Sequence, residues 1–259
     1  MFFSESSNMA CSLPRSTKKE KMKNYLSFGG GVNSVAMHLL LLNRGWEFES
    51  VFVDHGTDWP ETYEYLEMFN GWLQERNFEP VIILKPDVEG FDSLYDFCDF
   101  KSIIPSMMFR WCTDKFKVSV LSNYYKKPCF NNLGIDMGEN HRAKLNHKRG
   151  IENRFPLIEF KLDRVDCCLF IKDRGLPVPM KSGCFICPYQ KNYQWKELRI
   201  IHPDLFCKAE QLENKVNSLR KEQNKKPIYL SGKPLRVVVE EDQYKLFEID
   251  EYPPCNCML

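Results

Sequence analysis

The sequence lacks an excess of charge of either sign. Its 36 Lys and Arg residues almost balance its 35 Asp and Glu residues, so the formal net charge is +1. Proteins that coat nucleic acids or membrane surfaces usually carry a large basic excess, because their affinity comes from neutralising phosphates. A broad basic surface is therefore not expected, whereas a few local cations suffice to bind a small nucleotide or a single strand.

Long apolar runs are also absent. The longest, from Val35 to Leu42, is interrupted by His38 and falls well short of the roughly 20 residues that a membrane helix needs. Residues 1–23 pass from two Phe to a Lys cluster without the apolar core of a signal peptide. We therefore expect a flexible leader over residues 1–23, no membrane partner and a cytoplasmic location.

The 11 cysteines are an odd number. In a reducing compartment they are expected to be thiols or metal ligands rather than a disulfide framework. Hydrophobic residues make up 43% of the chain, enough to bury a large core, so global disorder is excluded.

Segments with strand and helix patterns alternate along the chain. Strands are expected at residues 25–28, 50–53, 81–84 and 130–133, with 157–160 as a candidate fifth and 236–239 as a terminal strand. Helices are expected at residues 34–43, 113–125, 163–174 and 203–221, and in a segment that starts near Pro60 with Asp58 as its cap. His38 lies on a helix that is apolar almost all round and is expected to be a core residue.

This alternation predicts an α/β fold with a doubly wound parallel sheet and a mostly helical, cysteine-containing C-terminal part. We expect a nucleotide-binding domain over residues 24–160 and an extension of the same domain over residues 161–259.

Residues 27–34 read Ser-Phe-Gly-Gly-Gly-Val-Asn-Ser between an expected strand and an expected buried helix. Successive backbone N–H groups and the positive end of a helix form a site for an anion. The loop is neither a Walker loop nor the Gly-x-Gly-x-x-Gly fingerprint. A glycine turn before a helix is also a common structural device, so the loop alone leaves both interpretations open.

The loop resembles the Ser-Gly-Gly-x-Asp-Ser pyrophosphate loop of the adenine nucleotide alpha hydrolase superfamily. Gly29 stands in the Ser position and Asn33 replaces the Asp, while Gly30, Gly31 and Ser34 match. Further segments resemble the phosphoadenosine phosphosulfate reductase family in the same order along residues 25–213. These segments are Val53-Asp54 with Gly56 and Pro60-Glu61-Thr62; Arg110-Trp111-Cys112-Thr113 with Lys115 and Lys117; Gly134-Ile135-Asp136 with Glu139 and Arg142; Pro156-Leu157-Ile158-Glu159; Gly175-Leu176-Pro177; and Gly183-Cys184-Phe185-Ile186-Cys187-Pro188.

The resemblance implies an enzyme that binds an adenine nucleotide, either ATP or phosphoadenosine phosphosulfate. Asn33 removes a negative charge beside the phosphates, which bears on whether Mg²⁺ is recruited. Asp136 and Asn140 are further departures from the family pattern. The nucleotide-binding residues implied are Ser27, Gly29, Gly30, Gly31, Asn33, Ser34, Asp54, Gly134, Glu139 and Arg142; catalytic residues are not identified.

The motif Cys184-x-x-Cys187 places two thiols on one tight turn, as zinc and iron–sulfur sites do. The resembling family places further cluster ligands in the region of Cys112. We expect a four-cysteine site that holds [4Fe-4S] or, otherwise, Zn²⁺, with Cys257 as the fourth ligand and Cys207 or Cys255 as alternatives. Because a buried cysteine often packs as a small hydrophobic residue, thiols without a metal stay open as the alternative. A tail cysteine could instead be a nucleophile, as in the family's reductases, but not in both roles at once.

Three functions stay open at this point. The first is ATP-dependent adenylation coupled to sulfur or amine transfer, with a nucleic acid or a sulfur-carrier protein as a candidate partner. The second is thiol-dependent reduction of a sulfonucleotide with release of sulfite. The third is a nucleotide-binding sensor without catalysis.

Overall fold

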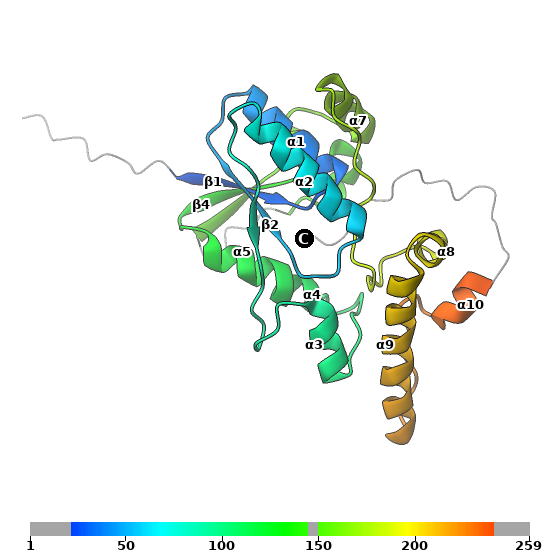
Figure 1. Cartoon of the computed structure of the whole chain (residues 1–259). Coiled ribbons are helices and arrows are strands. Elements are labelled where there is room, and N and C mark those ends of the chain that lie inside the picture. Colours follow the sequence, from blue (N-terminus) through cyan, green and yellow to red (C-terminus); the bar gives the residue numbers. More distant parts are fainter. Residues whose placement is uncertain (1–21, 145–149, 241–259) are drawn as a thin grey trace, which may run out of the picture.

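A five-stranded parallel sheet forms the centre of the computed structural model, which describes residues 22–144 and 150–240 (Figure 1). The strands lie in the order β3-β2-β1-β4-β5 and all pair in parallel. Their bounds are β1 Lys23–Phe28, β2 Glu49–Val53, β3 Ile82–Leu84, β4 Cys129–Leu133 and β5 Ile151–Arg154. The α/β prediction is confirmed.

Helices cover both faces of the sheet, because side chains alternate between the faces along each strand. On one face, Leu26 and Phe28 pack in the main core with α1 (Val32–Asn43), α2 (Pro60–Gln74) and α7 (Arg164–Asp173). On the other face, Tyr25 and Val51 pack against α5 (Ser119–Tyr124). The sheet is therefore doubly wound, as expected.

Helix α1 begins at Val32, directly after the glycine loop, and its residues from Val32 through Leu41 are all buried. His38 is 2% exposed, and its Nδ1 lies 2.8 Å from the hydroxyl of Ser50. The expectation of a core histidine is confirmed.

Three local predictions are wrong. Residues 157–160 form no strand: Pro156 starts a short helix, α6 (Pro156–Glu159), and the fifth strand is the polar segment β5. Asp58 does not cap α2, because Trp59 is the residue that precedes the helix. The backbone of Asp58 instead forms an isolated antiparallel β-bridge with Cys184.

The expected terminal strand is instead a helix, α10 (Leu235–Glu240). Leu235 and Val238 are buried and three residues apart, whereas Val237 is 40% exposed, which is helical rather than alternating burial.

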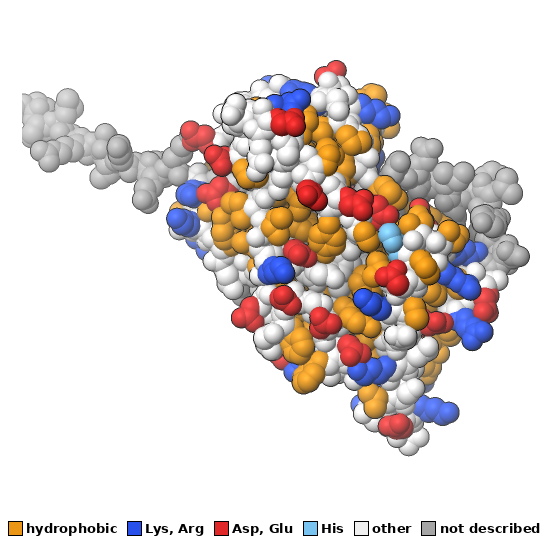
Figure 2. Space-filling view, in the orientation of Figure 1, with side chains coloured by type: hydrophobic (Ala, Val, Ile, Leu, Met, Phe, Trp, Pro, Cys, Tyr) orange, Lys and Arg blue, Asp and Glu red, His pale blue; other side chains and the backbone are white. Residues whose placement is uncertain are grey.

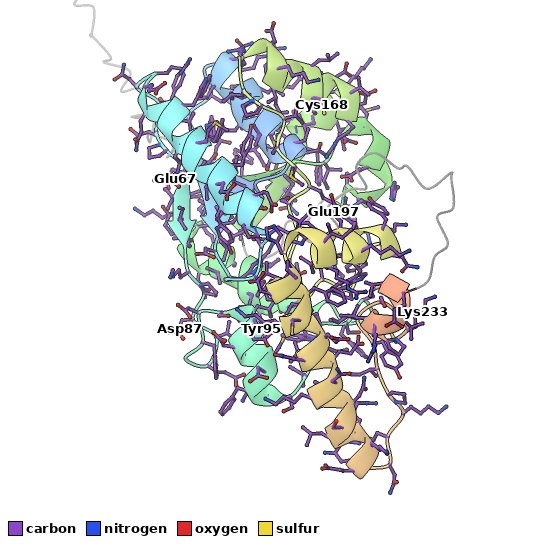
Figure 3. All side chains as sticks on the ribbon, turned by 45° about the vertical axis from the view of Figure 1, so that its right-hand side comes forward. Glu67, Asp87, Tyr95, Cys168, Glu197 and Lys233 are labelled. Atoms are coloured by element: carbon purple, nitrogen blue, oxygen red, sulfur yellow. The ribbon has the colours of Figure 1, made fainter. Side chains whose placement is uncertain are left out.

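A second core lies beyond the sheet, among α3 (Leu94–Lys101), α8 (Asn192–Ile201), α9 (Pro203–Glu222) and α10. Tyr95 of α3 reaches α9, where its hydroxyl donates to the Lys208 carbonyl at 3.4 Å (Figure 3). At the centre of this second core lies Trp195, which is fully buried.

Between the sheet and these helices, α4 (Trp111–Thr113) and a π-helical turn (Asp114–Val118) precede α5, so the expected helix at residues 113–125 is helical but irregular. A 3₁₀ helix (Met137–Arg142) follows β4. No helix in the described parts of the chain is long and apolar enough to cross a membrane. Basic and acidic side chains are interspersed on the face that Figure 2 shows.

Candidate functional site

A pocket lies at the carboxyl ends of β1, the central strand of the sheet, and its neighbour β4. The chain leaves β1 toward β2 on one side, whereas β4 pairs with β5 on the other, so the pocket lies where the strand order reverses. Open α/β sheets bind their ligands at this position. The pocket holds about 570 Å³ of space, part of it open to solvent.

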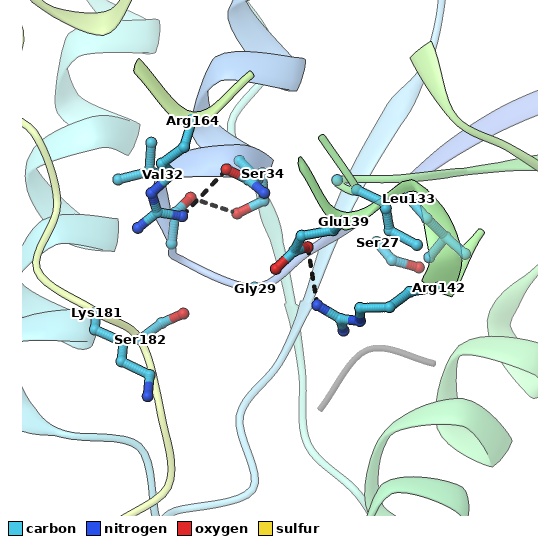
Figure 4. Close-up of a pocket in the computed structure, with 14 residues that line it drawn as sticks. Ser27, Gly29, Val32, Ser34, Leu133, Glu139, Arg142, Arg164, Lys181 and Ser182 are labelled. Carbon is cyan, nitrogen blue, oxygen red and sulfur yellow. Dashed lines mark hydrogen bonds and ion pairs between the residues drawn. The ribbon is translucent and has the colours of Figure 1, made fainter. Parts of the chain in front are cut away.

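Loops from both strands line this pocket, which we call the loop pocket (Figure 4). Its lining residues are Ser27, Gly29, Gly31, Val32, Asn33, Ser34, Leu133, Gly134, Ile135, Glu139, Arg142, Arg164, Lys181 and Ser182.

Two glycines keep the loop close to its neighbours. Gly30 has a positive φ of 72°, and a Cβ there would lie 2.6 Å from the Thr62 methyl carbon. A Cβ at Gly134 would lie 3.0 Å from the backbone nitrogen of Ser34. The loops after β1 and β4 are therefore in backbone contact, which only glycine at position 134 permits without displacement.

Asn33 lies at the centre of a hydrogen-bond network. Its Nδ2 donates to Asp136 Oδ2 at 3.0 Å, and its Oδ1 accepts from Arg164 Nη1 at 3.1 Å. Asp136 also caps the 3₁₀ helix, since its Oδ1 accepts from the Glu139 backbone N–H at 3.0 Å. Two of the departures from the family pattern, Asn33 and Asp136, are thus hydrogen-bonded to each other.

Glu139 and Arg142 form an ion pair inside the loop pocket. Arg142 Nη1 and Glu139 Oε2 are 2.8 Å apart, and each side chain is 10% exposed. Burial, the largest cause, raises the pKa of the Glu139 carboxyl to about 7; Asp136 raises it further, and Arg142 and Arg164 oppose the rise.

Two cationic residues of the pocket were missed in the sequence. Arg164 is the first residue of α7, and Lys181 precedes the cysteine motif. A cation in the first turn of a helix opposes the helix dipole. That conflict, directly after the predicted Asp163 cap, was a signal that Arg164 has a role other than helix stability.

The predicted nucleotide-binding residues do not all line this pocket. Gly30 is in the loop but does not line the pocket, and its Cβ position faces Thr62 of α2. Asp54 lies directly after β2, where its Oδ1 accepts from the Gly56 N–H at 2.9 Å and from the Tyr63 hydroxyl at 3.0 Å. The Ser27 hydroxyl donates to Asn131 Oδ1 at 2.8 Å. Ser27 and seven more of the ten predicted residues come together around the pocket, as the lining residues above show.

A second pocket, which we call the cysteine pocket, brings together Cys112, Cys184 and Cys187. Their neighbours there are His55, Leu94, Pro105, Arg110, Thr113, Lys117, Pro188 and Tyr189. Burial raises the pKa of the Cys112 and Cys184 thiols, so a metal ion would have to displace their protons.

The Cys184-x-x-Cys187 segment forms the expected tight turn, in which the Cys187 N–H donates to the Cys184 carbonyl at 3.0 Å. In residues 22–144 and 150–240, however, no three His, Cys, Asp or Glu side chains are placed to hold one metal ion. Cys257 and Cys255 lie outside the described residues, and Cys207 is exposed on α9.

His55 is a buried residue that lines the cysteine pocket. It is 1% exposed; its Nδ1 lies 2.6 Å from the Thr57 hydroxyl and its Nε2 lies 3.4 Å from Asp58 Oδ2. Burial lowers the pKa of His55 to about 4, so it is neutral near pH 7.

One segment borders both pockets. Ser182 lines the loop pocket and Cys184 lines the cysteine pocket, and two residues span at most about 7 Å. The segment is held to the end of β2 because Trp59 N–H donates to the Gly183 carbonyl at 3.0 Å and Phe185 N–H donates to the Thr57 carbonyl at 2.8 Å. The two pockets are therefore neighbours.

Fold and site together define an α/β protein with a glycine-lined, cation-containing pocket at the switch point of a parallel sheet. No family model matches the chain. An uncharacterized protein of Methanocaldococcus jannaschii is 26% identical over 208 residues, which cover 73% of this chain and 47% of that protein. The chain thus spans about half the length of this curated relative.

Two solved structures are similar in part. One is phosphoadenylyl-sulfate reductase from Candida auris in a phosphate complex, with a TM-score of 0.45 and 14% identity, covering 62% of this chain and 76% of that chain. The other is a predicted subunit of a tRNA methyltransferase from Methanocaldococcus jannaschii, with a TM-score of 0.29 and 14% identity, covering 80% and 90%.

Proposed function

We propose that the loop pocket binds the phosphates of an adenine nucleotide, and that the chain is an enzyme of the adenine nucleotide alpha hydrolase superfamily that uses ATP. The observation that carries this proposal is the position and lining of the pocket. Backbone N–H groups at the start of α1, with Arg142, Arg164 and Lys181, surround a space at the sheet's switch point.

The proposed reaction has two steps. An oxygen of the acceptor attacks the α-phosphorus of ATP, an acceptor–AMP bond forms, and pyrophosphate leaves. A sulfur or amine nucleophile then displaces AMP and takes its place on the acceptor. Arg142, Arg164 and Lys181 would stabilise the charge that develops on the leaving pyrophosphate, because fixed cations in a partly buried pocket need little reorganisation.

The acceptor class we propose is a nucleic acid or a sulfur-carrier protein. The test supplies α-labelled ATP with RNA, single-stranded DNA or a sulfur-carrier protein, and measures labelled AMP. Labelled AMP that depends on one acceptor supports the proposal. The Arg164→Ala variant should lower the rate by at least about tenfold, since it removes a phosphate-directed cation.

Sulfite release from phosphoadenosine phosphosulfate with thioredoxin, without AMP formation from ATP, would overturn the reaction and favour a sulfonucleotide reductase. The convergence of three thiols beside the loop pocket is the observation that keeps this second candidate in the test. Tight ATP binding with no turnover on any acceptor would favour a nucleotide sensor.

We further propose that Cys112, Cys184 and Cys187, with Cys257, hold a [4Fe-4S] cluster or Zn²⁺. Three thiols share one pocket, in which metal binding would have to draw their sulfur atoms closer together. Arg110 and Lys117 also line the pocket, where their charges would balance those of metal-bound thiolates. A bound cluster would supply a redox or sulfur-binding centre, whereas zinc would activate or fix a thiolate.

Metal analysis of anaerobically purified protein tests this site. A brown protein with iron and a visible absorption band indicates the cluster, and a colourless protein with one equivalent of zinc indicates the alternative. Cys112→Ser should lose the metal, whereas Cys168→Ser, a partly buried cysteine of the other core, should keep it. Protein free of metal under these conditions would contradict the proposal.

A further inference from the structure

Glu139 is a carboxylate in a pocket that otherwise favours anions. Arg142, Arg164 and Lys181 line the same space, together with the backbone of the glycine loop. In Figure 4, Glu139 projects toward this space beside Gly29, and a dashed line joins it to Arg142. The carboxylate therefore lies where a bound phosphate would meet the Arg142 guanidinium.

The ion pair is shielded from water, since both side chains are only 10% exposed. A buried arginine without a counter-ion is strongly unfavourable, so Arg142 needs an anion whether or not a ligand is bound. The same planar guanidinium can pair either with a carboxylate or with two oxygens of a phosphate. Glu139 supplies that anion when the pocket holds no ligand.

We propose that Glu139 takes the place of a phosphate in the ligand-free pocket. When a phosphate or pyrophosphate group binds, Glu139 releases Arg142 and takes up a proton. The inference rests on the proposed function, because it concerns the same pocket. The proton comes from solvent and ends on the Glu139 carboxyl; the Arg142 guanidinium keeps its own protons and exchanges one oxyanion partner for another.

Charge repulsion supplies the reason for proton uptake. A phosphate in the pocket would place at least one further negative charge beside a carboxylate from which water is excluded. The groups that face Glu139 are Arg142 and Asp136 from its own helix and helix cap, and Arg164 from α7, while Lys181 enters the pocket from the segment before Cys184. Because the pKa of Glu139 is already raised to about 7, protonating it near neutral pH costs little.

The sign of the pH dependence follows. Above pH 7 the carboxyl of the ligand-free protein is mostly ionised, so binding must add a proton, and affinity falls as pH rises. Below pH 7 the proton is already present and the effect levels off. Between pH 7 and 8.5 the linkage weakens binding by about tenfold.

Calorimetric titration with inorganic pyrophosphate tests the inference, at pH 7 and 8.5 and in two buffers of different ionisation enthalpy. The buffer dependence of the heat gives the number of protons taken up. The Glu139→Gln variant cannot ionise at this position, so its affinity should change about tenfold less than that of the natural protein between these pH values. Titration of pyrophosphate itself is common to both proteins and cancels in the comparison.

Glu152→Gln is the matched control. Glu152 lies on β5, and its Oε1 is 3.7 Å from Arg154 Nε. This carboxylate–arginine pair is more exposed than the pair of Glu139 and Arg142 and does not line the loop pocket. It should bind pyrophosphate like the natural protein. If Glu139→Gln does not fold, the natural protein is titrated with sulfate, an anion that does not take up protons between pH 7 and 8.5, so that any proton uptake on binding belongs to the protein.

Uptake of most of one proton above pH 7.5, absent from Glu139→Gln, is the expected result. Binding with equal proton uptake in both proteins would overturn this inference and leave the proposed pocket intact. No binding of pyrophosphate or ATP by either protein at any pH would overturn both.

Discussion

At the scale of single residues, Asn33 and Asp136 form a hydrogen-bonded pair between the loop after β1 and the loop after β4. The Asn33 amide has a donor end toward Asp136 and an acceptor end toward Arg164. A carboxylate at position 33 could accept from Arg164 but could not donate to Asp136. The Asn33 amide therefore satisfies its two partners in one orientation only.

The first prediction is a coupled pair of substitutions. Asn33→Asp places two carboxylates about 3 Å apart, where the hydrogen bond is now 3.0 Å long, and should lower the free energy of unfolding by about 1–3 kcal/mol. Adding Asp136→Asn restores a donor and should recover at least half of that loss. Urea unfolding of both single variants and the double variant measures the coupling, and additive effects would contradict it.

The second prediction concerns Gly134. Gly134→Ala should weaken ATP binding by about tenfold, equivalent to about 1.4 kcal/mol, because its Cβ would lie 3.0 Å from Ser34 N and push the loop away from the phosphates. Gly183→Ala is the control, since a Cβ there meets no atom within 4 Å. Equal ATP affinities in the two variants, measured by calorimetry, would show that the close contact does not shape the pocket.

Among the elements, α7 positions a pocket residue by its cap. The Asp163 side chain accepts from the Asp166 N–H at 2.9 Å, and the Asp166 carboxylate accepts from the Asp163 N–H at 3.1 Å. The predicted cap is thus present, and it fixes the first turn, which carries Arg164. The burial of Cys167 and Ile171 against α1 fixes the other side of the helix.

The third prediction tests this cap. Asp163→Ala should lower the free energy of unfolding by about 1 kcal/mol and should weaken ATP binding, because Arg164 loses a fixed backbone. Asp163→Asn keeps a side-chain acceptor and should leave both quantities nearly unchanged. If the two variants lost ATP affinity equally, the charge of Asp163 rather than its capping role would be responsible.

The elements that could be predicted from sequence are those with a dense local signal. The buried helix α1 and the strands β1 and β2 are rich in apolar residues, and α7 has its cap. Strand β5 escaped prediction because its sequence Ile-Glu-Asn-Arg is polar, and an edge strand needs only its backbone to pair. The local sequence predicts Asp58 as a cap because the long-range pairing of Asp58 with Cys184 leaves no local pattern.

The same distinction holds for the candidate site. The glycine loop and the Gly134, Glu139 and Arg142 segment could be found because each is a local pattern that resembles a known one. Arg164 and Lys181 could not be placed in the pocket, since they reach it only when α7 and the segment before Cys184 pack beside α1. The sequence also gives no sign that Asn33 and Asp136, 103 residues apart, would meet.

At the scale of the whole molecule, two cores meet beside the pockets. The core around α1 and α2 belongs to the sheet, and the core around Trp195 combines α3 with α8, α9 and α10. Glu61 at the start of α2 connects them through His202, whose Nε2 lies 2.8 Å from Glu61 Oε1. Because the segment shared by the two pockets crosses the same boundary, the relative position of the two cores sets the separation of the two sites.

The last prediction concerns the stability of the whole fold in acid. Burial lowers the pKa of His38 to about 3, so below pH 6.5 the unfolded chain binds a proton there that the folded chain does not. The stability due to neutral His38 is complete above pH 6.5 and is lost at about 1.4 kcal/mol per pH unit as pH falls toward 3. His38→Gln should reduce this slope by that amount, whereas His141→Gln, at an exposed position, should not. Urea unfolding between pH 7 and 5 measures the slopes, and equal slopes for the natural protein and His38→Gln would mean that His38 does not contribute to acid unfolding.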